Sequence, residues 1–340
     1  MKGKYIALIV AGSIMLAGAG MAVGAMAMSS FNFDKIMSVG EEKMLERTVE
    51  INERFSDINI KNVSVTIEPA GSDKASVYIT ELEKYKIDAK VENDALSIVG
   101  NDTRKWYDYI FSVNWPKAIL YLPEKEYGEL TADNNSDSVK VEDGLKFEEA
   151  TIDVSSGSVK FDSDVAGDLK IKATSGSIKV NGVSAANIEA YATSGSVKAT
   201  DINTADLDLT ATSGSVTLSG TKASEVTAYA KSGSVRLDGV SVEENISTKA
   251  TSGSIHYENV IAGGNILAET TSGSVRLEEC DGANLDLKTT SGSIHALLLS
   301  GKEITANTSS GSIRLPEENV EKNGKLNAEA TSGSITIKVK

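Results

Sequence analysis

The sequence predicts an all-β protein, a single-stranded β-solenoid of 19–20-residue rungs preceded by one transmembrane helix. Three observations predict this fold class. The tripeptide Ser-Gly-Ser recurs ten times at nearly constant spacing, and apolar residues alternate with polar ones on both sides of its glycine. The composition, with 29 Gly, 4 Pro and 5% aromatic residues, also favours strands and tight turns over packed helices.

The N-terminal segment predicts a membrane anchor. The uncharged stretch Tyr5 to Met28 follows Lys2 and Lys4 and, as a helix, is long enough to cross a hydrocarbon core of about 30 Å. Positive charge stays on the cytoplasmic side, so the predicted order is a cytoplasmic tail, a transmembrane signal-anchor helix and a juxtamembrane tether, at residues 1–4, 5–28 and 29–46. The alternative is a signal peptide cleaved at Ala25-Met26-Ala27.

The repeat divides the remaining chain into two parts. Its structural turn glycines are Gly157, Gly176, Gly195, Gly214, Gly233, Gly253, Gly273, Gly292, Gly311 and Gly333. The steps between them are 19, 19, 19, 19, 20, 20, 19, 19 and 22 residues, and a degenerate copy lies at Ser136-Asp137-Ser138. Residues 136–340 are therefore predicted to form the regular solenoid. Residues 47–135 lack this register and are predicted to form irregular N-terminal β rungs and a cap.

Apolar columns predict how the rungs bury their core. Two and four residues after each glycine the side chain is apolar, as in Val159 and Phe161, and the residue between is polar. One rung cannot bury this row, but stacked rungs about 4.8 Å apart align it into a continuous interior. The only cysteine, Cys280, is seven residues after its glycine and is expected to be buried. Its column contains Val183, Ile202, Val240, Val260 and Leu299.

The corner residues are interpreted as structural. Glycine is expected at each corner because it adopts the positive φ that such bends often need. The flanking serines are expected to stack into hydroxyl ladders that satisfy backbone groups. No histidine or carboxylate recurs beside them to act as a base, so they are not predicted to be nucleophiles.

An outward column three residues after each glycine is the candidate binding site. Stacked about 4.8 Å apart, its cations predict a stripe that binds a polyanion such as teichoic acid. The stripe consists of Lys160, Lys179, Lys198, Arg236, His256, Arg276, His295 and Arg314, with Thr217 and Thr336 in the same column. The alternative is an ordinary solvated face, because acids follow two residues later at Asp162, Asp238, Glu258 and Glu278.

Composition limits the function classes. A formal net charge of −14 argues against nucleic acid as a partner, since such proteins need cations to displace counterions. The single cysteine excludes an intramolecular disulfide. The two histidines are expected two rungs, about 10 Å, apart and cannot share one metal ion. No catalytic residues, cofactor or metal site are therefore predicted.

Two further motifs carry a family resemblance. The segment Arg104-Lys105-Trp106-Tyr107-Asp108-Tyr109-Ile110 and the serial Thr-Ser-Gly-Ser-Val/Ile repeats resemble the bacterial "putative adhesin" family of β-strand-repeat proteins, a domain of unknown function. The resemblance covers nearly the whole chain. It implies a β-helical ectodomain on a single-pass anchor, in a Gram-positive type of cell and often encoded near envelope-stress genes. It implies no catalytic residues.

Together these features predict a non-enzymatic, membrane-anchored extracytoplasmic surface protein, an adhesin or cell-envelope binding scaffold. Its N-terminus is expected in the cytoplasm and its bulk outside. The expected partners are the membrane, through the N-terminal helix, and a cell-wall polymer, glycan or another surface protein. The last rung, ending at Lys338 and Lys340, is predicted to leave an open edge for end-to-end self-association. The alternatives are an envelope-stress sensing or accessory protein acting through a membrane partner, and a polysaccharide-active β-helix enzyme.

Overall fold

The computed structural model describes residues 43–105, 115–317 and 321–340. The predicted cytoplasmic tail, transmembrane helix and most of the tether lie outside the described residues, as does most of the aromatic segment 104–110. The chain divides into one unit of residues 1–44 with 103–115 and a second of residues 45–102 with 116–340. In the described residues of the second unit every element is a strand. The part of the chain that the structure describes contains no helix long and apolar enough to span a membrane.

Strands that precede the Ser-Gly-Ser corners form a first hydrogen-bonded ladder. Its pairs are parallel except β5–β6, and the short β12 (Asp164–Val165) adds to the start of β10. In spatial order the ladder is β5 (Tyr85–Glu92), β6 (Ala95–Asp102), β2 (Asp57–Lys61), β8 (Glu126–Asn134), β10 (Lys146–Val154), β13 (Asp168–Ala173), β15 (Asn187–Ala192), β17 (Asn203–Ala211), β19 (Lys222–Ala230), β21 (Ile246–Ala250), β23 (Asn265–Thr270), β25 (Asn284–Ser291), β29 (Lys322–Ser332) and β27 (Gly301–Ser310).

Strands that follow the corners form a second ladder beside the first. Its pairs are parallel except β1–β4 and β4–β7. In spatial order it is β1 (Leu45–Ile51), β4 (Ala75–Glu81), β7 (Lys117–Leu122), β3 (Ser64–Pro69), β9 (Val139–Val141), β11 (Val159–Phe161), β14 (Ile178–Asn181), β16 (Val197–Thr200), β18 (Val216–Ser219), β20 (Val235–Val242), β22 (Ile255–Ala262), β24 (Val275–Cys280), β26 (Ile294–Leu298), β30 (Ile335–Val339) and β28 (Ile313–Arg314).

The inward side chains of both ladders form one core, which confirms the predicted β-solenoid. The register sets Val159 opposite Ile178 and Ile178 opposite Val197, and these side chains are at most 1% exposed. Cys280 is buried, as predicted. Its column continues through the buried Leu298 and not through the predicted Leu299, which is exposed. A β-bulge after Glu278 shifts the register there by one residue.

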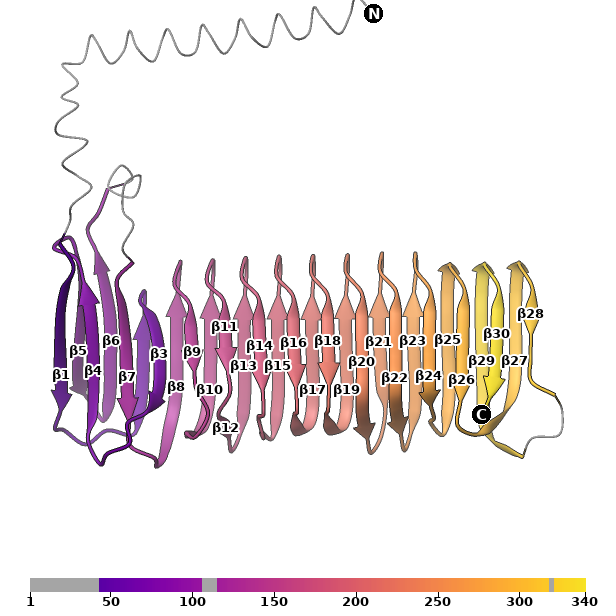
Figure 1. Cartoon of the computed structure of the whole chain (residues 1–340), viewed down its shortest axis with the longest axis horizontal. Helices are drawn as coiled ribbons and strands as arrows, with labels where there is room; N and C mark the ends of the chain where they lie inside the picture. Colours follow the sequence, from indigo (N-terminus) through magenta and orange to yellow (C-terminus); the bar gives the residue numbers. More distant parts are fainter. Residues whose placement is uncertain (1–42, 106–114, 318–320) are drawn as a thin grey trace, which may run out of the picture. The chain divides into compact units, whose positions relative to one another are not determined.

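Chain order and spatial order diverge at both ends of the stack (Figure 1). At the N-terminal end β2 lies between β6 and β8. In the second ladder β3 lies between β7 and β9. At the C-terminal end β29 lies between β25 and β27, and β30 lies between β26 and β28. The rung of β27 and β28 is therefore the outermost one.

This exchange corrects two predictions. The rung that ends at Lys338 and Lys340 is not the outermost one, because β28 pairs with Ile335 and Thr336 of β30. At Lys338, beyond the end of β28, β30 is paired only with β26. Ile313 and Leu315 were expected to face the core but are 41% and 47% exposed, because no further rung covers theirs.

The corner glycines are needed for space, which corrects their predicted role. Only Gly311 and Gly333 of the ten have a positive φ. At every corner an added Cβ would overlap a backbone carbonyl oxygen of the neighbouring rung, as for Gly214 against Gly195. The close stacking of rungs at the corner therefore excludes any side chain.

The predicted hydroxyl ladder forms at the serine after each glycine. The Ser234 amide donates to Ser215 Oγ at 3.2 Å, and the Ser215 amide donates to Ser196 Oγ at 3.2 Å. The same bond recurs from rung to rung and follows the exchanged order at the end, from Ser293 to Ser334 to Ser312. These hydroxyls thus satisfy corner amides, in keeping with a structural role.

Positive φ occurs instead at a second corner, six residues after the glycine. This column was missed in the sequence, although turn-forming residues fill most of it at a constant offset. Its members are Gly182, Asp201, Gly220, Gly239, Asn259 and Glu279. Strands β14, β16 and β18 end just before this corner, whereas β20, β22 and β24 continue through it.

Candidate cationic surface

The register places the whole predicted stripe in one outward column of the second ladder. Lys160 opposes Lys179, which opposes Lys198, and the pairing continues rung by rung to the outermost strand. We call this set the cationic column. In spatial order it contains Lys140, Lys160, Lys179, Lys198, Thr217, Arg236, His256, Arg276, His295, Thr336 and Arg314.

Two features of the column were not foreseen. Lys140 extends it by one rung beyond Lys160. The signal was present, since Lys140 is three residues after Asp137 of the degenerate Ser-Asp-Ser copy. At the other end, Thr336 separates His295 from Arg314, because β30 is inserted before β28.

Near its N-terminal end the column is neutralised by a neighbouring acid column. Glu142 accepts from both Lys140 and Lys160, the latter at 3.1 Å, and Lys160 also pairs with Asp162. The hydrogen bond from Lys140, together with Lys160, holds the pKa of Glu142 below its usual value against the opposing effect of burial. The hydrogen bond to Asp162 raises the pKa of Lys160. These lysines are therefore held charged, but their charge is compensated.

The next two rungs lack this compensation. Lys179 and Lys198 are exposed, and neither forms an ion pair with a carboxylate of the described residues. The positions two residues later, where acids stand in other rungs, hold the neutral Asn181 and Thr200. Adjacent strands place the two ammonium groups on neighbouring rungs about 4.8 Å apart at the backbone. This pair is an uncompensated part of the cationic column.

A second compensated region lies toward the C-terminal end. Arg236 donates to Glu258 at 3.0 Å, and Arg276 pairs with Glu278 on its own strand. His256 Nε2 lies 3.8 Å from Glu258. Ligand atoms of His256, Glu258 and Glu278 all lie within 4.8 Å of one another, so these three could hold a metal ion. Because a guanidinium already pairs with each carboxylate, the cluster is charge-balanced as it stands.

The predicted separation of the two histidines is confirmed. His256 opposes Arg276, which in turn opposes His295, so one full rung lies between the imidazoles. Sequence reasoning missed the His256, Glu258 and Glu278 cluster, because Glu278 comes from the adjacent rung. Only the in-register pairing of Glu258 with Glu278 brings it near.

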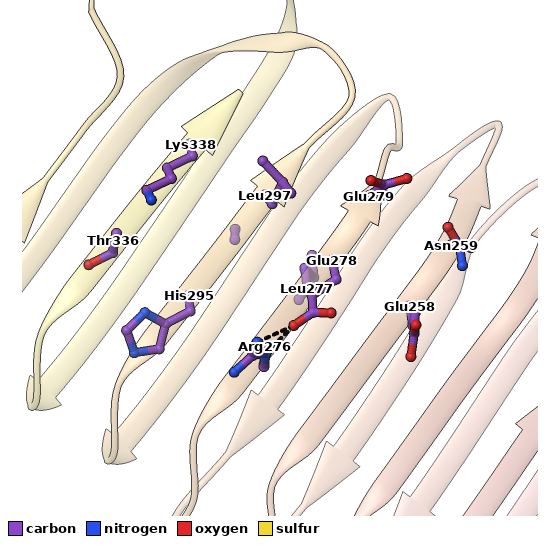
Figure 2. A pocket seen from close by; sticks show the side chains of 11 residues that line it. Glu258, Asn259, Arg276, Leu277, Glu278, Glu279, His295, Leu297, Thr336 and Lys338 are labelled. Atoms are coloured by element: carbon purple, nitrogen blue, oxygen red, sulfur yellow. Dashed lines mark hydrogen bonds and ion pairs between the residues drawn. The ribbon is translucent and has the colours of Figure 1, made fainter. Parts of the chain in front are cut away.

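A shallow groove of about 500 Å³ crosses this region (Figure 2). Strands β22, β24, β26 and β30 form its floor. Its lining places Glu258 and Glu278 toward one side and His295 and Lys338 toward the other, with Arg276 joined to Glu278 by the dashed lines in the view. The groove is therefore of mixed charge, whereas Lys179 and Lys198 stand without carboxylate ion pairs among the described residues.

Burial makes the only cysteine unsuited to surface chemistry. It raises the pKa of the Cys280 thiol to about 11, so the thiolate is scarce at neutral pH. The thiol donates to the Glu278 carbonyl oxygen at 3.2 Å. Cys280 therefore acts as a core residue.

Comparisons with known proteins bear on the family. The chain matches no curated protein. Two similar crystal structures are titled putative adhesins, from Parabacteroides distasonis (17% identity, TM-score 0.44, covering 76% of this chain and 98% of that one) and Parabacteroides merdae (18%, 0.42, 76% and 97%). Another from P. distasonis is titled a putative lipid binding protein (14%, 0.38, 76% and 98%). The model of the Toastrack DUF4097 family matches residues 55–243 and 239–340. The chain belongs to the Toastrack DUF4097 family.

Proposed function

We propose that this protein is a non-enzymatic, extracytoplasmic surface protein that binds an acidic cell-envelope polymer through its cationic column. One observation carries the proposal. Lys179 and Lys198 stand on neighbouring rungs, exposed and without carboxylate partners, in a chain whose net charge is −14. A cation that is left unpaired on an acidic protein is available to an anionic ligand.

The geometry favours a polymer over a small anion. Each rung offers one cation at most, and successive rungs repeat it along a straight, hydrogen-bonded ladder. A chain with regularly spaced phosphates or carboxylates can contact several rungs at once. Weak single contacts then add up, since each later contact forms at high effective concentration.

The test measures binding of the full-length chain, in detergent micelles, to fluorescent poly(glycerol phosphate), with dextran as the uncharged polymer. Lys179→Gln/Lys198→Gln is expected to raise the Kd about tenfold in low salt. Added salt is expected to weaken binding of the unmodified chain, because these contacts are exposed and screened.

A matched control separates the column from net charge. Lys172→Gln/Lys231→Gln removes two exposed lysines outside the column and is expected to change the Kd less than twofold. Equal loss in both double variants would show a general charge effect and refute the column as the site. Equal affinity for dextran would refute acidic-polymer binding altogether.

We extend the proposal to an anchor formed by residues 5–28. Its support is the uncharged stretch behind Lys2 and Lys4. The expected result is that the protein stays with membranes through an alkaline carbonate wash, with its repeats open to protease added outside the cell. Recovery in the washed supernatant would contradict the anchor and favour cleavage after Ala27.

The absence of enzymatic activity is a further part of the proposal. The serines after the glycines accept hydrogen bonds from backbone amides. Arg236 pairs with Glu258 and Arg276 pairs with Glu278, so both carboxylates near His256 are already engaged. A panel of acidic polysaccharides is therefore expected to release neither reducing nor unsaturated ends. Release of either that is lost in Glu258→Gln would establish an enzyme.

A further inference from the structure

The outermost rung of the stack has an open edge. Among the described strands, β27 pairs only with β29, and β28 pairs only with β30. Ile313 and Leu315 are 41% and 47% exposed, whereas Ile335, the counterpart of Ile313 one rung inward, is fully buried. The rung therefore presents a ten-residue strand edge together with apolar side chains that every other regular rung covers.

The side chains that usually protect such an edge are missing. The outward positions along β27 after Glu303 are Thr305, Asn307 and Ser309, all uncharged and exposed. At the opposite end of the stack, the edge strand β5 carries a charge at every second position. These charges are Lys86, Asp88, Lys90 and Glu92, and β1 adds Glu46, Arg47 and Glu50. Charged edges discourage pairing with another chain, so among the described edge strands β27 is the one suited to it.

We infer that two copies of this chain associate tail to tail through the β27–β28 rung, with β27 of one copy pairing antiparallel to β27 of the other. A second copy fits this edge because it brings the same neutral strand and the same apolar row. The outward charges of the rung, Glu303 and Arg314, have opposite signs, so the approach of two copies does not bring together a single sign of charge.

Because the two ends of the stack differ in edge charge, they also determine how many copies assemble. A self-complementary contact between identical surfaces closes as a two-fold dimer, whereas head-to-tail contacts would continue into a filament. The charged antiparallel strands β1 and β5 disfavour the head-to-tail contact. The expected assembly is a dimer that does not grow further. This interface is separate from the uncompensated lysines of the cationic column.

The test is sedimentation equilibrium of the full-length chain in detergent at increasing protein concentration. The chain is expected to pass from monomer to dimer and stop there. Thr305→Lys/Asn307→Lys places two charges on the open edge, at exposed outward positions, and is expected to raise the dimer Kd at least tenfold. Thr48→Lys, at an exposed position of β1, is the matched control and is expected to leave the dimer unchanged.

Both variants keep the same N-terminal segment, so a difference between their dimer Kd values is due to the β27–β28 rung. Hydrogen exchange gives a second readout, because β27 amides are expected to gain protection with concentration only in chains that dimerise. A monomer at all concentrations, or an unchanged dimer in the Thr305→Lys/Asn307→Lys variant, would overturn the inference. Growth beyond two copies that Thr48→Lys abolishes would show head-to-tail assembly instead.

Discussion

The middle of the stack and its two ends share one register but differ in chain order. From β10 to β24 each rung lies between its sequence neighbours. At the N-terminal end β2 lies inward of β5 and β6, and β3 lies inward of β4 and β7. At the C-terminal end β29–β30 lies inward of β27–β28. Because all rungs carry similar columns, any rung fits beside any other. The register therefore determines which residues oppose each other, and local contacts must select the order of the rungs.

Buried polar side chains supply such contacts at both ends. Near the N-terminal end, Asn134 is buried and exchanges two hydrogen bonds with the backbone of Val63, at 3.1 and 2.8 Å, which ties β8 to the β2–β3 corner. Near the C-terminal end, the buried Lys302 of β27 donates to the carbonyls of Gly282 and Asn323 and pairs with Asp281 at 2.8 Å. The Asn134 contact joins segments 71 residues apart, and Lys302 joins β27 to the corner that precedes β25 and to the start of β29.

The largest expected effect contrasts a middle corner with the outermost one. Gly214→Ala is expected to destabilise the protein by about 3 kcal/mol, because its Cβ would overlap the Gly195 carbonyl oxygen between two fixed rungs. Gly311→Ala meets a similar overlap with Gly333, but its rung can move outward, and the expected loss is less than half as large. Urea denaturation measures both. Equal losses would show that the outermost rung is held as firmly as the middle.

Lys302→Met tests the tie at the C-terminal end. The substitution would leave Asp281 without its ammonium partner and is expected to lower the free energy of unfolding by about 2–3 kcal/mol. This loss is smaller than is usual for a buried ion pair because the Asp281 side chain is 24% exposed. Hydrogen exchange should quicken in β29 and β30 while β15 and β17 stay protected. Adding Asp281→Asn should restore part of the stability. Uniform loss along the stack would show that Lys302 does not act locally.

Acid is expected to destabilise the C-terminal end of the stack before the middle. Burial alone would raise the pKa of Asp281, but the hydrogen bonds from Lys302 and Ser300 outweigh it and hold the pKa below the ordinary 3.8. A lowered folded-state pKa stabilises above the unfolded value, and this contribution is lost as the pH falls through the folded value. Hydrogen exchange of the β29 amides is therefore expected to become faster below about pH 3.8 in the unmodified chain. In Lys302→Met the increase is expected to be less steep. Parallel pH profiles would contradict this.

The smallest expected effect concerns the hydroxyl ladder. Ser215→Ala removes the acceptor of the Ser234 amide and is expected to cost about 1 kcal/mol. Ser312→Ala, in the outermost rung, removes only a hydroxyl bond to Ser334 Oγ at 3.2 Å, and about half that cost is expected. Thermal denaturation under identical conditions measures both. A larger loss at Ser312 would reverse the ranking of middle and end.

Several parts of the candidate site could be predicted because they depend only on spacing. The alignment of Lys179 beside Lys198 follows from the constant step of 19 residues together with period-2 side-chain alternation. The burial of Cys280 follows in the same way. The compensation of Lys160 by Glu142 was missed, since Glu142 belongs to the rung before, where the tripeptide is degenerate.

The sequence by itself determined the columns: which side chains face the core, which corners need glycine and which cations stand in line. These features depend only on the residues within one repeat, and the same residue pattern recurs in every repeat. Only the tertiary structure decided the order of the terminal rungs, the identity of the open edge and the one-residue shift after Glu278. The reason is physical: similar rungs pair equally well in any order, so the choice depends on single long-range contacts such as Asn134 with Val63.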